Sequence, residues 1–160
     1  MNFLTPLAIR IGAIPWLPRF LPQITAFDKL IQRATRGRLT LLRIAGLPNL
    51  MLTVRGRKSG IPRTTPLLCV PHESGFLIAG SNFGGLKPPV WVVNVRAAVE
   101  KGERVGMRFD GRSHEADVRE ITGAERERLW PHMVRTWPNY ARYAERTDRT
   151  IPVFLLEPVT

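Results

Sequence analysis

Short runs rich in Leu, Val and Ile alternate with glycine-containing turns over the last two thirds of the chain, as in the strands of a sheet. One turn, Asp110-Gly111, is of the kind that joins two strands in a tight hairpin. The predicted strands are Leu50–Val54, Thr65–Val70, Phe76–Gly80, Val105–Phe109, a return strand that carries residues 114–119, and Ile151–Leu156.

Helical spacing appears between these runs and before them. Thr25 and Asp28 resemble a capping box, and apolar residues follow at intervals of three or four, so we predict a helix from about 25 to 36, ended by Gly37. Three more helical segments are predicted: Pro89–Ala98, a helix that opens on the capping box Thr122–Glu125 and is kinked or restarted by Pro131, and Asn139–Arg146.

The predicted order of elements favours an α+β fold. About six mostly antiparallel strands in hairpin order, with helices between them, are typical of a small barrel. At 160 residues the chain is long enough for one such core. We divide it into an N-terminal apolar and basic lead with an amphipathic helix (1–36) and a barrel domain (37–160).

Positive charge is concentrated in the N-terminal half. Residues 1–72 contain eleven Arg or Lys and one acid, Asp28, whereas residues 73–160 contain thirteen Arg or Lys and twelve acids. The first part therefore carries a formal charge of +10 and the second +1. A surface so unbalanced is expected to face phosphates, an anionic cofactor or acidic lipid.

The remaining composition excludes several classes of site. The single cysteine, Cys69, rules out an internal disulfide and a CxxC metal site, and its apolar neighbours predict a packed, inert thiol. The three histidines are scattered, so no metal site is predicted. The longest charge-free run, Ser74–Leu86, has thirteen residues, against the roughly 18 that a membrane span needs. We expect a soluble, cytoplasmic protein.

The segment Gly56–Leu67 is the first candidate site. Arg55, Arg57, Lys58 and Arg63 crowd around a turn with two glycines and no acid. Glycines permit a tight turn on which guanidinium and ammonium groups converge, which suits a phosphate or a polycarboxylate. A solvated charged loop is about as good an interpretation, and a cavity beside the turn would separate the two.

Two further segments carry candidate chemistry. The loop from Ser81 to Pro89 contains paired glycines and leads into a helix on which Trp91 and Asn94 share a face. Trp137, Tyr140 and Tyr143 recur every three residues and could form an aromatic wall bearing two hydroxyls. Core packing is the alternative for all of these aromatic residues.

Together these motifs resemble the deazaflavin-dependent nitroreductase family, also described as F420H2-dependent quinone reductases. The resemblance covers residues 37–158 and rests on a set of motifs in order: GRKSG-x-PR-x-x-PL, a Ser-containing Gly-rich loop, P-x-W-x-x-N, W-P-x-Y-x-x-Y and T-D-R-T-I-P-V. It implies a flavin-reductase-like split β-barrel with peripheral helices. It also implies coenzyme F420 as the cofactor, with a flavin mononucleotide (FMN) as the alternative.

The resemblance assigns roles to individual residues. The phosphate and glutamate tail of F420 would be held by Arg57, Lys58, Ser59 and Arg63. The deazaflavin would lie along Thr64, Thr65, Pro66, Leu67, Leu68, Ala79, Gly80, Ser81, Asn82, Val90, Trp91, Val92, Val93, Asn94 and Tyr140. The substrate side would comprise Trp137, Tyr140 and Tyr143. Leu68 and Trp137 stand where the best-known nitroimidazole-reducing members have an aromatic residue and a tyrosine.

The implied reaction is hydride transfer from reduced F420 to a quinone, enone or nitro acceptor. Ser81 or Tyr140 would hydrogen-bond the acceptor oxygen as catalytic residues, without a covalent nucleophile.

Other classes of function stay open on sequence alone. One is a non-catalytic carrier of F420 or FMN. Another is a basic module that docks on an anionic membrane, at the inner face of the cell membrane, through residues 1–36. Nucleic acid is not an expected partner because no aromatic-basic platform is present, and oligomers are compatible with the barrel.

Overall fold

A single curled sheet of seven antiparallel strands organises the protein in a computed structural model that describes residues 3–35 and 39–159. The strand order is β2-β1-β5-β6-β7-β4-β3, and every neighbouring pair is antiparallel. The strands are β1 (Asn49–Arg55), β2 (Pro62–Leu68), β3 (Val70–His72), β4 (Gly75–Ala79), β5 (Val105–Phe109), β6 (Arg112–Ile121) and β7 (Val153–Pro158).

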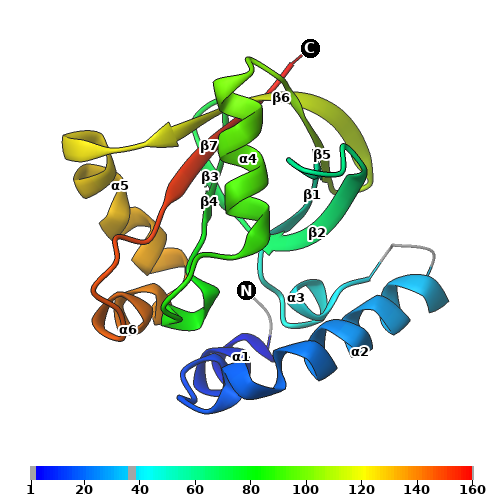
Figure 1. The fold of residues 1–160 in the computed structure, drawn as a ribbon. Coiled ribbons are helices and arrows are strands. Elements are labelled where there is room, and N and C mark those ends of the chain that lie inside the picture. The colour runs from blue at the N-terminus through cyan, green and yellow to red at the C-terminus, as the bar shows by residue number, and fades with distance from the viewer. Residues whose placement is uncertain (1–2, 36–38, 160) are drawn as a thin grey trace.

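Helices surround the sheet (Figure 1). They are α1 (Thr5–Gly12), α2 (Leu21–Ala34), α3 (Leu41–Ile44), α4 (Val90–Glu100), α5 (Gly123–Thr136) and α6 (Asn139–Glu145), with short 3-10 turns η1 (Leu17–Phe20) and η2 (Asn82–Gly84). The α4 helix crosses one face of the sheet, α5 and α6 lie at one end, and α1 and α2 lie below. Within residues 3–35 and 39–159, each helix is too short or too polar to span a lipid bilayer.

The architecture confirms the predicted α+β split barrel with mostly antiparallel strands. The strand Val105–Phe109, its turn at Asp110-Gly111 and its return partner form as predicted. Both turn residues take positive φ, 46° and 80°, as a two-residue hairpin of this type requires. The helix predicted from Pro89 begins at Val90, with Pro89 as its extended cap.

The strand predicted over residues 65–70 is wrong in its extent. Strand β2 begins three residues earlier, at Pro62, and the chain breaks at Cys69 before β3 starts. The reason is a non-local hydrogen bond, since the Cys69 amide donates to the Pro48 carbonyl (3.0 Å) rather than to a ladder partner. The sheet therefore has seven strands.

The helix predicted from 25 to 36 starts at Leu21 instead. Pro22 occupies its first turn, where a missing N–H costs nothing, and Thr25 lies in the helix interior. The carboxylate of Asp28, which the capping box would have placed at the helix start, accepts the Leu41 amide (2.7 Å) and Gln32 Nε2 (2.8 Å). The predicted stop at Gly37 lies outside the described residues.

The predicted start of α5 at Thr122 is confirmed, but its capping box is wrong. Thr122 is extended and makes no side-chain cap hydrogen bond. The Glu125 carboxylate does not cap the helix because it pairs with Arg119, whose guanidinium donates to both carboxylate oxygens at 2.8 Å. This pairing lowers the pKa of the Glu125 carboxyl. The helix continues through Pro131 as a single element, so no restart occurs.

Two apolar clusters form the core. One lies between α4 and the curl of the sheet, where Trp91, Val92 and Val95 pack on Leu52 and Phe154. The other lies at the α5–α6 end and gathers these residues: Leu47, Val70, Leu77, Ile121, Met133, Trp137, Tyr140, Tyr143, Ile151, Val153 and Leu155. The sheet is thus covered on both sides of its β4–β7 half.

The N-terminal segment is fastened to α6 by side chains that reach its carbonyls. The Tyr143 hydroxyl donates to Gly12 O (2.8 Å), Asn139 Nδ2 donates to Ile9 O (2.8 Å), and Arg146 donates to Ala13 O. These carbonyls lie at the end of the α1 helix; Ile9 O also accepts the Ala13 amide (3.1 Å), whereas Gly12 O and Ala13 O lie beyond the last helical hydrogen bond. The α1 helix consequently covers Trp137, whose ring would meet a Cβ at Gly12 at 2.8 Å.

Replacing Tyr143 with Phe should loosen this attachment. The buried Gly12 carbonyl would lose its donor, so we expect the free energy of unfolding to fall by about 1–2 kcal/mol. Amide exchange in α1 should quicken more than exchange in the sheet. Urea melts and hydrogen exchange measure both effects. Tyr140→Phe is the matched control, because the Tyr140 hydroxyl makes no hydrogen bond to the described residues; equal losses in both variants would contradict the assignment.

Candidate functional site

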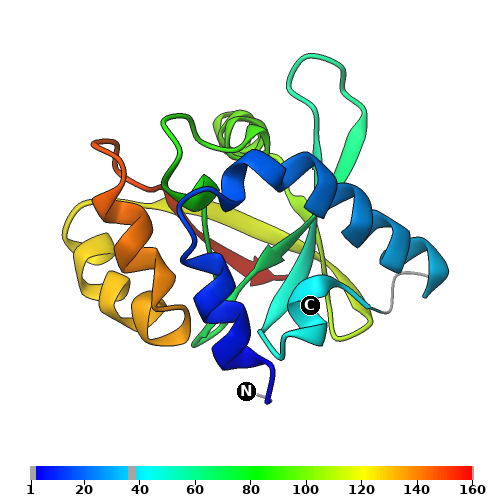
Figure 2. The ribbon, with the colours of Figure 1, turned by 90° about the horizontal axis from the view of Figure 1, so that it is seen from below.

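The basic turn, residues 56–61, joins β1 to β2 and extends beyond the body of the molecule (Figure 2). Its backbone closes through Gly60 N to Gly56 O (2.7 Å) and Gly56 N to Ile61 O (2.9 Å). Gly60 has φ of 67°, which favours glycine, and a Cβ on Gly56 would lie 2.6 Å from Ser59 Oγ and displace that hydroxyl. The predicted tight turn is therefore present.

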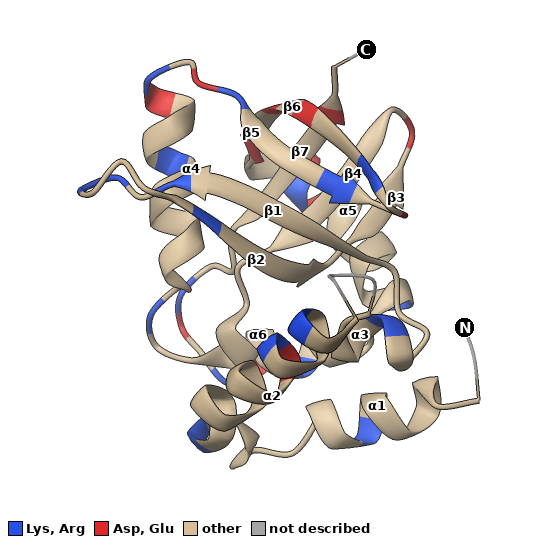
Figure 3. Cartoon of the chain, turned by 90° about the vertical axis from the view of Figure 1, so that its right-hand side faces the viewer, with Lys and Arg blue, Asp and Glu red and all other residues tan. Residues whose placement is uncertain are grey.

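The cations of this turn and of the strand ends beside it are not neutralised by acids in the described part of the chain. Arg57, Lys58 and Arg63 are exposed, and none of them forms an ion pair with an acid among residues 3–35 and 39–159. In Figure 3 the end of the hairpin is blue with no red near it. Arg55 instead donates to the Gly60 carbonyl (3.3 Å). Several like charges held close together in this way attract an anion.

Two residues predicted to bind the cofactor tail or ring have structural hydrogen bonds in the turn. Asn94, buried on α4, accepts the Arg57 amide with Oδ1 (3.1 Å) and so ties the turn to the helix. Ser59 Oγ accepts the Ile61 amide (3.3 Å). Thr64, exposed on β2, shares a hydroxyl–hydroxyl bond of 2.8 Å with Thr53.

The second predicted segment, after β4, contacts α4 in its first turn. Ser81 and Asn82 are partly exposed, and Asn82 Nδ2 donates to Lys87 O (3.0 Å). Gly80 is buried so tightly that a Cβ there would lie 2.4 Å from Val92. The basic turn and the Ser81 loop, residues 80–86, therefore both contact α4, the first through Asn94 and the second through Val92.

The predicted site residues differ in exposure. Along β2, Thr65, Pro66, Leu67 and Leu68 are half-buried, as is Ala79 at the end of β4. On α4, Val90 is 73% exposed and Val93 half-buried, whereas Trp91 and Val92 pack into the core, with Trp91 edge-on to Phe154. Val90, Val93 and the β2 residues can therefore meet a ligand directly, whereas Trp91 and Val92 support them from behind.

The aromatic residues predicted to line the substrate side lie in the core beneath α1. Trp137, Tyr140 and Tyr143 are 8%, 3% and 2% exposed. The Tyr140 ring packs against Trp130 and against Tyr143, with centroids 5.8 and 6.4 Å apart. Burial raises the pKa of the Tyr140 hydroxyl, so this group stays protonated.

Two arginines that the sequence analysis did not single out hold the Ser81 loop. Arg149 donates to the carbonyls of Gly80, Ser81 and Gly85, and Arg146 donates to Phe83. Arg149 stands in the T-D-R-T-I-P-V motif, which was the only signal for it. Its acceptors are backbone carbonyls, which every residue carries, so no residue type in the sequence identifies them as partners of Arg149.

A cavity of about 670 Å³ lies away from these segments, against the start of β1 and the β5–β6 turn. Its lining includes Arg43, Met51, Arg108 and Phe109 but none of the predicted site residues. The cavity expected beside the basic turn is therefore not this one. The turn is open to solvent, as the interpretation as a solvated charged loop predicts, and the cavity beside its base, lined by Arg55, Pro62 and Glu103, holds only about 160 Å³.

Comparison with known proteins points to the same family as the sequence motifs. The family model described as F420H(2)-dependent quinone reductase matches residues 27–158. An F420H(2)-dependent quinone reductase of Mycobacterium tuberculosis is 32% identical over 150 residues, which cover 88% of this chain and 95% of that protein.

Solved structures with similar sequences share the fold of this chain. An F420-H2 dependent reductase, FDR-A, has 35% identity and a TM-score of 0.61, over 69% of this chain and 94% of its own. A chain described as a domain-swapped dimer has 32% identity and a TM-score of 0.63, over 83% and 95%.

The single thiol should be inert in the folded protein. Cys69 is fully buried, and this burial raises the pKa of its thiol to about 12. Because the unfolded thiol titrates near 8.5, its contribution to stability is complete below that pH and is lost as the pH rises toward about 12. At pH 8 we expect disulfide-exchange labelling to be about a thousandfold slower in the native protein than in denaturant. Labelling at similar rates in both states would contradict this burial.

Proposed function

Because this chain belongs to the F420H(2)-dependent quinone reductase family, we propose that it transfers a hydride from reduced F420 to a quinone. The observation that carries the proposal is the unpaired positive charge of the basic turn beside α4 and the Ser81 loop. These two segments are the parts of the fold that the resemblance assigns to the cofactor's tail and ring.

The donors in this chain fit an acidic cofactor tail. Arg57 and Arg63 offer planar forks and Lys58 a mobile ammonium, which suit phosphate and carboxylate oxygens. Their exposure fits a tail that stays in solvent. The ring would lie between the half-buried stretch of β2 and the Ser81 loop.

The chemistry of the transfer belongs to the cofactor, which supplies the hydride when it is bound in its reduced form. The protein would orient the ring and the quinone and exclude water between them. The Ser81 hydroxyl, partly exposed at the loop, is our candidate donor to the quinone oxygen. Tyr140 stays protonated and would stabilise charge at that oxygen from the core side.

Removing the basic turn's charge should weaken cofactor binding. For Arg57→Ala with Lys58→Ala we expect the Kd for F420 to rise about tenfold to a hundredfold, since two charge-assisted contacts are lost. The effect should shrink at high salt. Quenching of cofactor fluorescence gives the Kd, and oxidation of reduced F420 by a soluble naphthoquinone gives turnover.

The matched control is Arg112→Ala with Arg135→Ala, which removes the same charge from exposed positions on β6 and α5. This variant should bind F420 like the unaltered protein. The proposal fails if the unaltered protein neither binds F420 nor oxidises its reduced form with any quinone, or if both double variants behave alike.

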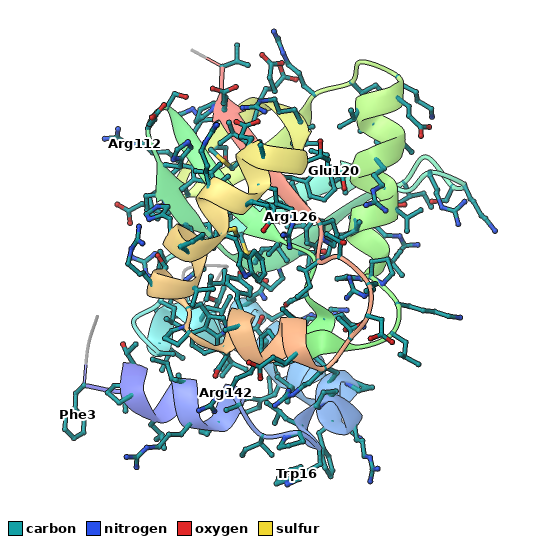
Figure 4. The ribbon with its side chains drawn as sticks, turned by 90° about the vertical axis from the view of Figure 1, so that its left-hand side faces the viewer. Phe3, Trp16, Arg112, Glu120, Arg126 and Arg142 are labelled. Carbon is teal, nitrogen blue, oxygen red and sulfur yellow. The ribbon has the colours of Figure 1, made fainter. Side chains whose placement is uncertain are left out.

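We also propose that the N-terminal helices rest on an anionic membrane surface, where quinones dissolve. Large apolar side chains project from these helices and the turn between them, among them Trp16 (55% exposed), Phe27 (56%) and Leu30 (60%). Phe3 and Trp16 point away from the protein in Figure 4. Exposed Arg10, Arg19, Lys29 and Arg33 lie among them. Apolar side chains beside basic ones are typical of helices that lie in the lipid interface.

Replacing Phe27 and Leu30 with Ser should reduce binding to vesicles that contain phosphatidylglycerol by about tenfold or more, because each side chain buries apolar area in the bilayer. Co-sedimentation measures the bound fraction. Leu86→Ser, which removes an exposed leucine outside the N-terminal helices, should leave it unchanged. Equal partition of all three proteins, or no binding to anionic vesicles at low salt, would remove the membrane from the proposal.

A further inference from the structure

The Ser81 loop has an unusual backbone. Asn82, Phe83 and Gly84 take φ values of 45°, 54° and 78°, three successive residues in the left-handed region. Only glycine enters this region without strain, and here two of the three residues carry a side chain. Such a conformation persists only where neighbouring groups hold it.

A single guanidinium holds both ends of this stretch. Arg149 Nη2 donates to Gly80 O (3.1 Å) and Ser81 O (2.8 Å), and its Nε donates to Gly85 O (2.9 Å). These carbonyls precede and follow the left-handed residues. The planar fork of arginine fixes the angles between its bonds, which the single ammonium of lysine cannot do.

Arg149 is not placed for an ion pair. It is partly buried, and no carboxylate among residues 3–35 and 39–159 pairs with it. Desolvation and the neighbouring Arg96 lower the pKa of its guanidinium. Burying a charge that only backbone carbonyls satisfy costs free energy. The position of the Arg149 guanidinium is therefore explained by the loop whose carbonyls it binds.

Arg146 completes the attachment in the middle of the loop. Its Nη1 donates to Phe83 O (3.4 Å), and Gly84 lies so close to α6 that a Cβ there would be 2.6 Å from Tyr143 O. The loop is thus fixed from the α6 side, and Ser81 within it is half-buried.

We propose that Arg149 is a positioning residue of the reductase. It holds the Ser81 loop in its left-handed form, so that Ser81 and Asn82 present a preformed edge to the deazaflavin ring and the quinone. Arg149 acts through the loop and touches neither reactant. This inference rests on the proposed function.

The test compares Arg149→Ala and Arg149→Lys with Arg135→Ala, which removes an exposed arginine from α5. For Arg149→Ala we expect the Kd for F420 to rise at least about tenfold and kcat to fall, because three charge-assisted bonds are lost. The Arg149→Lys variant should show nearly the same loss of F420 affinity and of kcat as Arg149→Ala. Amide exchange of residues 82–86 should quicken in both Arg149 variants without cofactor present, and thermal melts establish that each variant is folded.

Chemical rescue separates positioning from a general loss of structure. Guanidinium at about 50 mM, well below denaturing concentrations, should restore part of the F420 binding and the slow exchange of the loop in Arg149→Ala. Sodium chloride at the same concentration should not. The Arg149→Lys variant should not respond, since its side chain occupies the site.

The outcomes separate this inference from the proposed function. If the unaltered protein does not bind F420, the proposed function fails and the reaction role of Arg149 fails with it. If the unaltered protein binds and turns over, but Arg149→Ala matches Arg135→Ala in Kd, kcat and loop exchange, only the inference is overturned. Should Arg149→Ala not fold, unchanged values in Arg149→Lys overturn it equally.

Discussion

The shape of the barrel depends on one residue, Cys69, which joins the two edge strands of the sheet. Strands β2 and β3 stand at opposite ends of the strand order, yet Cys69 alone separates them along the chain. Because one residue advances the chain by about 3.8 Å, the sheet must curl until its two edges meet. The buried thiol and the bond from the Cys69 amide to Pro48 O fix this step. The closure carries the end of β2 toward β4, whose last residues lead into the Ser81 loop.

The basic turn grows from the edge strand that this closure leaves exposed. Free strand edges pair with other chains unless charge or proline prevents it. Strand β2 contains Pro62 and Pro66, which cannot donate to a further strand, and Arg63 lies between them. The same residues keep the edge unpaired and the cations at its tip accessible. Binding an anionic ligand and preventing aggregation therefore both require an unpaired strand edge that carries positive charge.

The sequence predicted elements whose signals are local and missed those fixed by distant contacts. Strand β5, its hairpin turn and α4 each carry their pattern within a few residues, and they formed as expected. The start of α2 was misplaced because Asp28 is taken by the Leu41 amide, thirteen residues away. The spacing of Trp137, Tyr140 and Tyr143 was correct, but their cover by α1 depends on packing that no local pattern records. The roles of Arg146 and Arg149 were not predicted for the same reason, because both donate to carbonyls more than 60 residues away in the sequence.

Arg146 also connects the two parts of the protein that the proposals treat separately. Its guanidinium donates both to Ala13 O, where the N-terminal segment leaves α1, and to Phe83 O in the Ser81 loop. The exposed apolar helices and the loop are thus linked by one side chain, and the aromatic cluster of α6 lies beside both. If the N-terminal helices dock on a membrane as proposed, a quinone that enters from lipid would reach the protein at α1 and α2 first. The docking of these helices and the conformation of the loop are therefore linked, because a displacement of α1 that moves the Arg146 guanidinium also alters its bond to Phe83 O.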